Sequence, residues 1–364
     1  MTDVDGELVG SAGAATRMPE VLRVVDGVAA IAADCAGEVD AHSRFPHEAV
    51  AAMREGQLLT CGFPGFRGGY GLSLHEIAAV VRMLSSRCAA TGMIFAMHQT
   101  LALTLVRHAE GPDLEAFLGE MLENQYLLAA ATTESTNGAG VIDAQAGFVG
   151  LTKHARMIAY AEYCDAILAT ATPSQDASPE AQVLAVCRRS NLTLERTESW
   201  EVMGLRGVNS PSYVVRATTV PRLILSEPYP TIFVETIRPI AFVLWAAVCL
   251  GIADAAVEKA LRYVADEGSS VRPARNESQL RLPDVLAQRD MFASIVDRAA
   301  ESWDTNQLEM VASQFAVDIV ASALAVCGMD GYRSTGAYTI ERHLRDAHGA
   351  ALLLNSYRAV ADSA

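Results

Sequence analysis

The sequence predicts a mainly helical α+β protein in which a small β domain separates two helical domains. Apolar residues recur at helical spacing up to about residue 125 and again from residue 233 onwards. Between these parts, apolar and β-branched residues alternate and are bounded by Gly, Pro and Asn, as in antiparallel strands. We therefore expect an N-terminal α-helical domain over 18–125, a middle β-barrel-like domain over 126–232 and a C-terminal four-helix bundle over 233–360.

In the first domain the apolar spacing predicts a helix over 19–40, and Phe45-Pro46 opens a second helix that ends at Gly56. The glycine-rich stretch 58–73 lacks the lysine of a phosphate-binding loop, so we interpret it as a connection between helices. Three more helices are expected, over 73–83, 89–108 and 113–124.

The middle domain is expected to contain strands over 148–151, 164–171, 182–188, 191–196 and 212–225. The bundle is expected to consist of helices over 233–266, 283–303, 307–326 and 340–354. A small-residue turn at Cys327, Gly328 and Gly331 interrupts the last part of this pattern. Such a turn allows another backbone or a ligand to approach closely.

The composition of the chain narrows the classes of molecule that we expect it to bind. The 364 residues are 51% hydrophobic and carry a formal net charge of −15, which argues against nucleic acid and anionic membranes as partners. The acidic N-terminal stretch does not resemble a signal peptide. The most apolar segment, 240–256, contains Trp245 and Asp254, so we expect a buried helix and no membrane span. We expect a cytoplasmic protein.

The seven cysteines are scattered, with no CxxC pair and no histidine cluster at the spacing of metal ligands. The sequence therefore predicts neither a metal site nor a disulfide framework. We expect reduced and mostly buried thiols.

Three stretches resemble the acyl-CoA dehydrogenases, and they occur in the order found in that family. The first is DAHSRFPHEAVAAMREGQLL followed by GFPGFRGGYGLSLHE, which is similar to the family's N-terminal helices. The second is WEVMGLRGVNSPSYVVRATTVP (200–221), which resembles its β-domain motif, and the third is CGMDGYRSTGAYTIERHLRDA (327–347), which resembles its C-terminal glycine-rich motif. Together they span nearly the whole chain.

The resemblance implies an FAD enzyme that oxidises an acyl thioester carried by CoA or a carrier protein and passes electrons to an acceptor. It also implies a homodimer or homotetramer, because the family's flavin lies at a subunit interface. A platform of amides, a dry slot and a proton-accepting carboxylate are the chemical requirements.

The resemblance places the flavin's polar edge at the loop Thr133–Gly140, with Thr133 on the cofactor and Gly138 near the substrate. An ordinary polar loop is the alternative interpretation. Counting back from Cys164-Asp165, the second platform falls on Met157 and Ala159, where the family has an aromatic residue and a Thr or Ser. Met157 as strand core is equally compatible with the sequence. In the C-terminal turn, Gly328, Met329 and Gly331 are the expected cofactor contacts.

The resemblance assigns the family's catalytic glutamate to Leu354, beside the substrate, and an alternative glutamate position to Ala241. Neither residue can accept a proton. The stretches RPIAFVLWAAVCLGIADAA and RHLRDAHGAALLLNSYR resemble the branch that includes flavin-dependent monooxygenases, in which reduced flavin and O2 oxidise the substrate without an α-proton base.

The helix 89–108 is the counterpart of one that lines the substrate slot in the family, so His98 is a candidate for both substrate contact and proton transfer. A satisfied core histidine is the alternative. His348 is a second candidate. Three functions stay open: an acyl-thioester oxidoreductase, a two-component monooxygenase served by a flavin reductase, and a non-redox or inactive subunit.

Overall fold

The computed structural model describes residues 11–132, 140–145, 147–172, 177–178, 181–268 and 277–361. Five helices precede the sheet: α1 (Ser11–Ala41), α2 (His47–Glu55), α3 (Leu74–Arg87), α4 (Ala89–His108) and α5 (Pro112–Asn124). Ser73 caps α3, because its hydroxyl accepts the N–H of Glu76 while the Glu76 carboxylate accepts the N–H of Ser73. The helices α4 and α5 match their expected bounds closely, whereas α3 continues to Arg87, beyond its expected end at residue 83.

The sheet contains β1 (Leu128–Ala131), β2 (Gly140–Gln145), β3 (Phe148–Ala155), β4 (Ala166–Thr172), β5 (Val183–Arg188), β6 (Leu192–Glu198) and β7 (Ser212–Thr219). The strand order is β1-β4-β2-β3-β7-β6. Within it, β1 and β2 pair with different parts of β4, and β5 pairs antiparallel with β4. The expected antiparallel pairing is wrong for two contacts, because β1 and β2 both run parallel to β4.

Two of these strands, β1 and β2, were not expected from the sequence. The alanine-rich stretch of β1 has little β propensity, and its pairing with β4 stabilises it instead. The strand predicted over 212–225 is also too long. It ends at Thr219, because Pro221 has no N–H for the ladder and begins a 3₁₀ turn.

Helices again follow the sheet: α6 (Tyr229–Ile232), a π-helical turn (Phe233–Ile237), α7 (Arg238–Gly268), α8 (Glu277–Ser302), α9 (Asn306–Tyr332) and α10 (Glu341–Ala361). The helix α7 is central, since it packs on α3, α4, α8, α9 and α10. The expected turn is confirmed inside α9, where Gly328 has φ +56° and ψ −136°.

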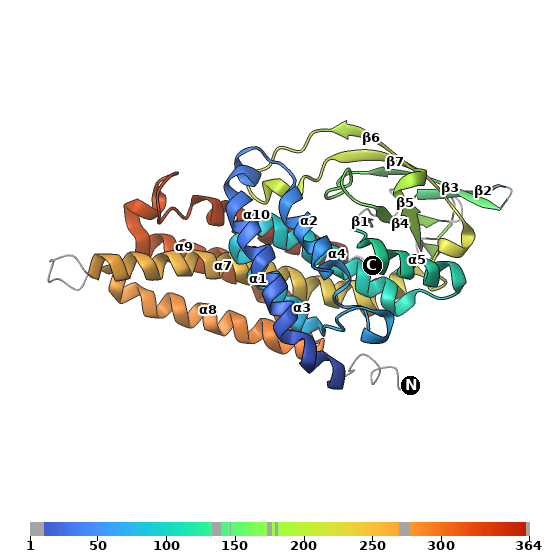
Figure 1. Ribbon diagram of the computed structural model, residues 1–364. Helices are drawn as coiled ribbons and strands as arrows, with labels where there is room; N and C mark the ends of the chain where they lie inside the picture. The colour runs from blue at the N-terminus through green and yellow to red at the C-terminus, as the bar shows by residue number, and fades with distance from the viewer. Residues whose placement is uncertain are drawn as a thin grey trace.

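The sheet lies over one end of the helical layer, and the turn between α9 and α10 lies at the opposite end (Figure 1). From that turn α10 runs back toward the sheet. The core is continuous between the N-terminal helices and the bundle, and in the described part of the chain it includes all seven cysteines, which are unpaired.

Three helical segments of the described chain are long and apolar enough to cross a membrane: Ala89–His108, Tyr229–Asp266 and Asn306–Tyr332. The expectation that 240–256 falls short of a span by composition is therefore wrong. Its expected burial is confirmed, because 94% of the most apolar window in 229–266 is covered within the fold. The corresponding window of α9 is only 39% buried.

Candidate functional site

The flavin-edge loop expected at Thr133–Gly140 begins directly after β1, and its residues Thr133 and Gly138 lie outside the described residues. The last described residue before it, Thr132, is buried. Its carbonyl oxygen accepts a hydrogen bond from the Tyr229 hydroxyl at 3.4 Å. The strand end from which the loop departs is therefore fixed against α6.

The second expected platform, Met157 and Ala159, lies just after β3 and is half-buried. The interpretation of Met157 as strand core is wrong, because β3 ends at Ala155. The neighbouring Ile158 and Tyr160 donate their N–H groups to Pro211 and Val208 at 3.1 and 3.0 Å, which ties this segment to the stretch before β7. The segment thus presents apolar side chains on a fixed backbone.

The C-terminal turn offers an open glycine surface. A Cβ added at Gly328 would meet no atom within 4 Å, whereas Gly331 is buried against Cys327. Met329 is 75% exposed. Figure 1 shows this turn at the end of the helical layer that lies away from the sheet.

The two positions assigned to catalytic glutamates are occupied by packed apolar residues. Leu354 on α10 is 4% exposed and Ala241 on α7 is 1% exposed. Among the residues that the structure describes, Asp346 is the one buried Asp or Glu. Its Oδ1 accepts the N–H of Leu205 at 2.7 Å, and burial raises its pKa to about 6. It therefore holds the turn before β7 onto α10.

The other candidate carboxylates in the described part of the chain do not lie in the core. Glu201 and Glu235 are exposed, and Glu134 lies outside the described residues.

His98 is fully buried and bonded to the main chain through both ring nitrogens. Its Nε2 lies 2.6 Å from the Leu59 oxygen, so it donates there, and its Nδ1 accepts the N–H of Leu128 at 3.0 Å. Burial lowers its pKa to about 4. This is the arrangement of a neutral core histidine, the alternative that the sequence left open. His348 is exposed on α10.

The sequence patterns did not mark His108, which is also buried. Unlike those of His98, its hydrogen-bond partners are side chains. His108 lies 2.8 Å from Glu227 through Nδ1 and 2.7 Å from Thr236 through Nε2. These residues stand 119 and 128 positions away from His108. Only the packing of α4 against the π-helical turn brings them together, and no local motif marks them.

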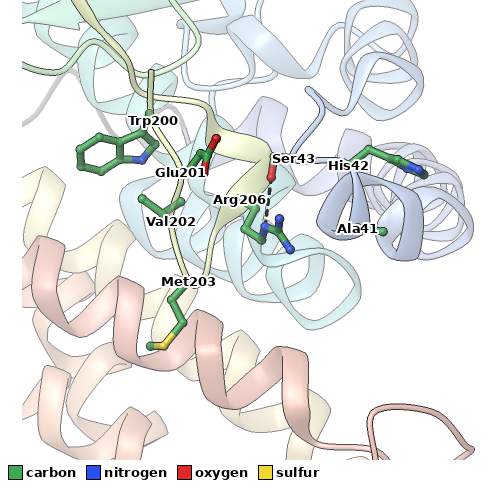
Figure 2. A pocket seen from close by; sticks show the side chains of 8 residues that line it. All are labelled: Ala41, His42, Ser43, Trp200, Glu201, Val202, Met203 and Arg206. Atoms are coloured by element: carbon green, nitrogen blue, oxygen red, sulfur yellow. Dashed lines mark hydrogen bonds between the residues drawn. The ribbon is translucent and has the colours of Figure 1, made fainter. Parts of the chain in front are cut away.

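An open hollow of about 610 Å³ lies between the end of α1 and the stretch before β7. Figure 2 shows the residues that line it. Arg206 reaches across it, and its Nε donates to the Ser43 hydroxyl at 3.0 Å. Trp200, Glu201 and Met203 line the opposite side. Of the expected site residues that the structure describes, none lines this hollow.

Comparisons with known proteins match the two helical parts of the chain to one family. Residues 22–125 match the model of the acyl-CoA dehydrogenase N-terminal domain, and residues 243–353 match that of the acyl-CoA dehydrogenase C-terminal domain. The chain belongs to the acyl-CoA dehydrogenase superfamily. The mitochondrial short-chain specific acyl-CoA dehydrogenase of Bos taurus is 23% identical over 334 residues, covering 86% of this chain and 80% of that protein.

Solved structures of this superfamily fold include oxygenases. The dibenzothiophene monooxygenase TdsC from Paenibacillus sp. A11-2 superposes with a TM-score of 0.79 at 19% identity, covering 94% of this chain and 96% of that chain. Its FMN-bound form gives a TM-score of 0.80 at 18% identity with the same coverage. A nitrososynthase from Micromonospora carbonacea var. africana gives 0.77 at 18% identity, covering 91% of each chain.

Membership of this superfamily supports a flavin-dependent oxidoreductase or monooxygenase. The described residues fit a flavin by shape. The half-buried, apolar Met157 and Ala159 offer a surface for a flat ring, and the open Gly328 turn allows close backbone approach. The N–H groups of Ile158 and Tyr160 are already used within the chain. Apolar contact is therefore what the side chains of this segment offer to a flat ring.

Proposed function

We propose that this chain is a flavin-dependent monooxygenase that receives reduced flavin from a separate reductase. The observation that carries the proposal is the pair of packed apolar residues, Leu354 and Ala241, at the positions assigned to the catalytic base. Removal of an α-proton from an acyl thioester requires a positioned base. Oxygenation by reduced flavin and O2 requires no carboxylate at these positions.

The relatives support a small substrate. TdsC is described as a dibenzothiophene monooxygenase and has been solved with FMN and indole, and another neighbour is a nitrososynthase. By analogy, the proposed substrate is a small aromatic, sulfur or amine compound. The proposed cofactor is FAD, as the family resemblance implies, with the FMN of TdsC as the alternative.

Each group has a defined task in this proposal. Bound reduced flavin supplies the electrons that activate O2. Met157 and Ala159 contact the ring through apolar surface, and Thr133 stays the proposed partner of its polar edge. Leu354 and Ala241 keep the adjoining core dry, which suppresses loss of reducing equivalents to water-assisted side reactions.

The second candidate is an FAD-dependent acyl-thioester oxidoreductase that passes electrons to an acceptor protein. The similarity to the bovine short-chain acyl-CoA dehydrogenase over 86% of the chain favours it. This function needs a carboxylate from another position, and the exposed Glu235 at the start of the bundle is the described candidate.

Flavin chemistry of the purified protein separates the candidates. The protein is loaded with FAD or FMN, and the retained flavin is identified after extraction. Reduced flavin plus O2 is then tested with indole and dibenzothiophene, and oxidised flavin is titrated anaerobically with short acyl-CoA thioesters. Oxygenated product at the expense of O2 supports the monooxygenase. Bleaching by thioesters refutes it in favour of the second candidate, and failure to bind either flavin refutes both.

The variant Leu354→Glu adds a sharper comparison. It restores a carboxylate at the assigned base position, with Leu354→Gln as the matched polar control. Thioester bleaching that appears in the Glu variant and not in the Gln variant indicates that the position faces an acyl slot. If neither variant bleaches the flavin, the assignment of this position to the base is wrong.

A further inference from the structure

Glu227, His108 and Thr236 form a continuous hydrogen-bonded chain from the surface to the interior. Glu227 belongs to the connection before α6, and its side chain is 45% exposed. His108, the last residue of α4, is 5% exposed, and Thr236 is completely buried. The two links measure 2.8 Å from Glu227 Oε2 to Nδ1 and 2.7 Å from Nε2 to Thr236 Oγ1. Both are good hydrogen-bond distances.

The chemistry of the partners fixes the tautomer of the imidazole. An ionised carboxylate only accepts hydrogen bonds, so Nδ1 of His108 carries the proton and donates to Glu227. In the neutral ring Nε2 is then an acceptor, and the Thr236 hydroxyl donates to it. The hydroxyl proton of a buried threonine thus points at the lone pair of a histidine that a carboxylate orients.

The inner end of the chain lies at the start of α7. Thr236 belongs to the π-helical turn Phe233–Ile237 that precedes α7, and such turns are frequent at functional sites. Seven residues earlier along the chain, Tyr229 donates to the carbonyl of Thr132. Thr132 is the residue directly before the loop assigned to the flavin edge.

We propose that Glu227, His108 and Thr236 form a proton relay between solvent and the start of α7. Outward transfer has two parts. A reacting ligand gives a proton to Thr236 Oγ while the hydroxyl proton moves to Nε2. The resulting imidazolium, paired with Glu227, then releases its Nδ1 proton to water at the exposed carboxylate.

Inward transfer is the reverse and restores the starting tautomer, so each cycle moves one proton out and one in. Only O–H and N–H bonds change, and no electrons are transferred. The reaction that the relay serves rests on the proposed function. In this arrangement Thr236 is the group that meets the ligand, while His108 and Glu227 act through it.

The nearby charges are compatible with a cationic ring during transfer. The other charged side chains on these segments are Arg107 on α4, Glu110 after α4 and Glu235 on the π-helical turn. Glu110 accepts a hydrogen bond from Ser226 at 3.1 Å, beside Glu227. Two of these three groups are acidic.

Isosteric substitutions test the relay. Thr236→Val keeps the shape of the side chain and removes the hydroxyl, whereas Thr236→Ser keeps the hydroxyl. Thr104→Val is the matched control, because Thr104 is equally buried on α4 and bonds only its own helix, to Thr100. We expect Thr236→Val and His108→Gln each to lower kcat by about 100-fold with little change in KM. Thr236→Ser and Thr104→Val should retain most of the rate.

Two further readouts separate a relay from a structural contact. The solvent isotope effect on kcat should rise in Glu227→Gln, and the losses in Thr236→Val and His108→Gln should not add in the double variant. A folded Thr236→Val protein with the wild-type rate overturns the relay.

A measurement without flavin distinguishes failure of the relay from failure of the proposed function. In ¹⁵N-histidine NMR spectra, His108 should carry its proton on Nδ1, and Glu227→Gln should shift the tautomer balance. A proton on Nε2 in the wild-type protein overturns the relay whatever the enzyme does. Absence of oxygenation with the expected tautomer and its response to Glu227→Gln refutes the proposed function alone.

Discussion

His98 and Asp346 are buried titratable side chains whose hydrogen bonds go mainly to the main chain. Burial lowers the pKa of His98 to about 4 and raises the pKa of Asp346 to about 6, and both shifts favour the neutral form. Each side chain joins segments that are distant in sequence: His98 joins α4 to Leu59 and Leu128, and Asp346 joins α10 to Leu205. At the scale of the residue, these side chains hold the fold together.

Asp346 should make the protein less stable as pH rises. Its folded pKa of about 6 lies above the usual 3.8, so the folded state retains the proton between these values. The free energy of unfolding should therefore fall between pH 4 and 7, by at most about 3 kcal/mol from this group. Asp346→Asn keeps an acceptor for Leu205, and urea unfolding should show a flatter pH profile for it. Identical profiles for the two proteins contradict the prediction.

His98→Leu should destabilise the protein by at least about 2 kcal/mol, because it leaves the Leu59 oxygen and the Leu128 N–H buried without their partner. The control His75→Leu removes a histidine whose side chain is 43% exposed and should cost less than about 0.5 kcal/mol. Urea unfolding at pH 7 measures both. Equal effects of the two substitutions would show that the buried contacts of His98 contribute little.

The backbone of α10 packs closely against Gly204, in the stretch before β7. A Cβ at Gly204 would lie 2.0 Å from the carbonyl oxygen of Arg345 on α10. Arg345 donates to the Met203 oxygen at 2.8 Å and to Asp40 of α1. The turn Gly204–Gly207 therefore holds α1, α10 and the sheet together. The close approach of the Arg345 backbone explains why residue 204 is a glycine.

Gly204→Ala should destabilise the protein by about 1–3 kcal/mol, since the backbone of α10 must shift to admit the methyl group. Gly119→Ala is the control within α5, where a Cβ meets open space, and it should stabilise by about 0.5–1 kcal/mol. Thermal unfolding of both variants tests the signs. A neutral Gly204→Ala variant refutes the close packing.

At the scale of the whole molecule, α9 is the helix whose apolar surface the protomer leaves open. Its most apolar window is 39% buried, and Met310 near its start is 73% exposed. Apolar surface of this kind is characteristic of interfaces. The separation of the Gly328 turn from the sheet agrees with a flavin site shared by two subunits (Figure 1). We propose a homodimer or homotetramer that buries α9.

Met310→Glu should shift the assembly toward monomer by placing a charge in an apolar interface. Phe148→Glu on β3 is the control, because Phe148 is also exposed, at 57%, and lies on the sheet. Sedimentation velocity at several concentrations measures the distribution. A wild-type protein that is monomeric, or a dissociating Phe148→Glu variant, contradicts the assignment of the interface to α9.

Local signals made several parts of this structure predictable. The Phe-Pro start of α2, the capping box of α3 and the glycine turn at Gly328 each depend on neighbouring residues, so their positions follow from sequence. The strands β1 and β2 were missed, because pairing with β4 and not intrinsic propensity makes them strands. For His98 the sequence left both a chemical role and a core role open, since only its partners distinguish the two.

The sequence by itself determined that a sheet region separates two helical regions, the superfamily, and the apolar residues at Leu354 and Ala241, because periodicity and motifs are encoded in adjacent residues. The tertiary structure decided which polar groups meet. It satisfied His98 through the main chain, buried Asp346 beneath Leu205 and joined His108 to Glu227 and Thr236. Those contacts connect positions more than a hundred residues apart or depend on burial, and no local pattern records either.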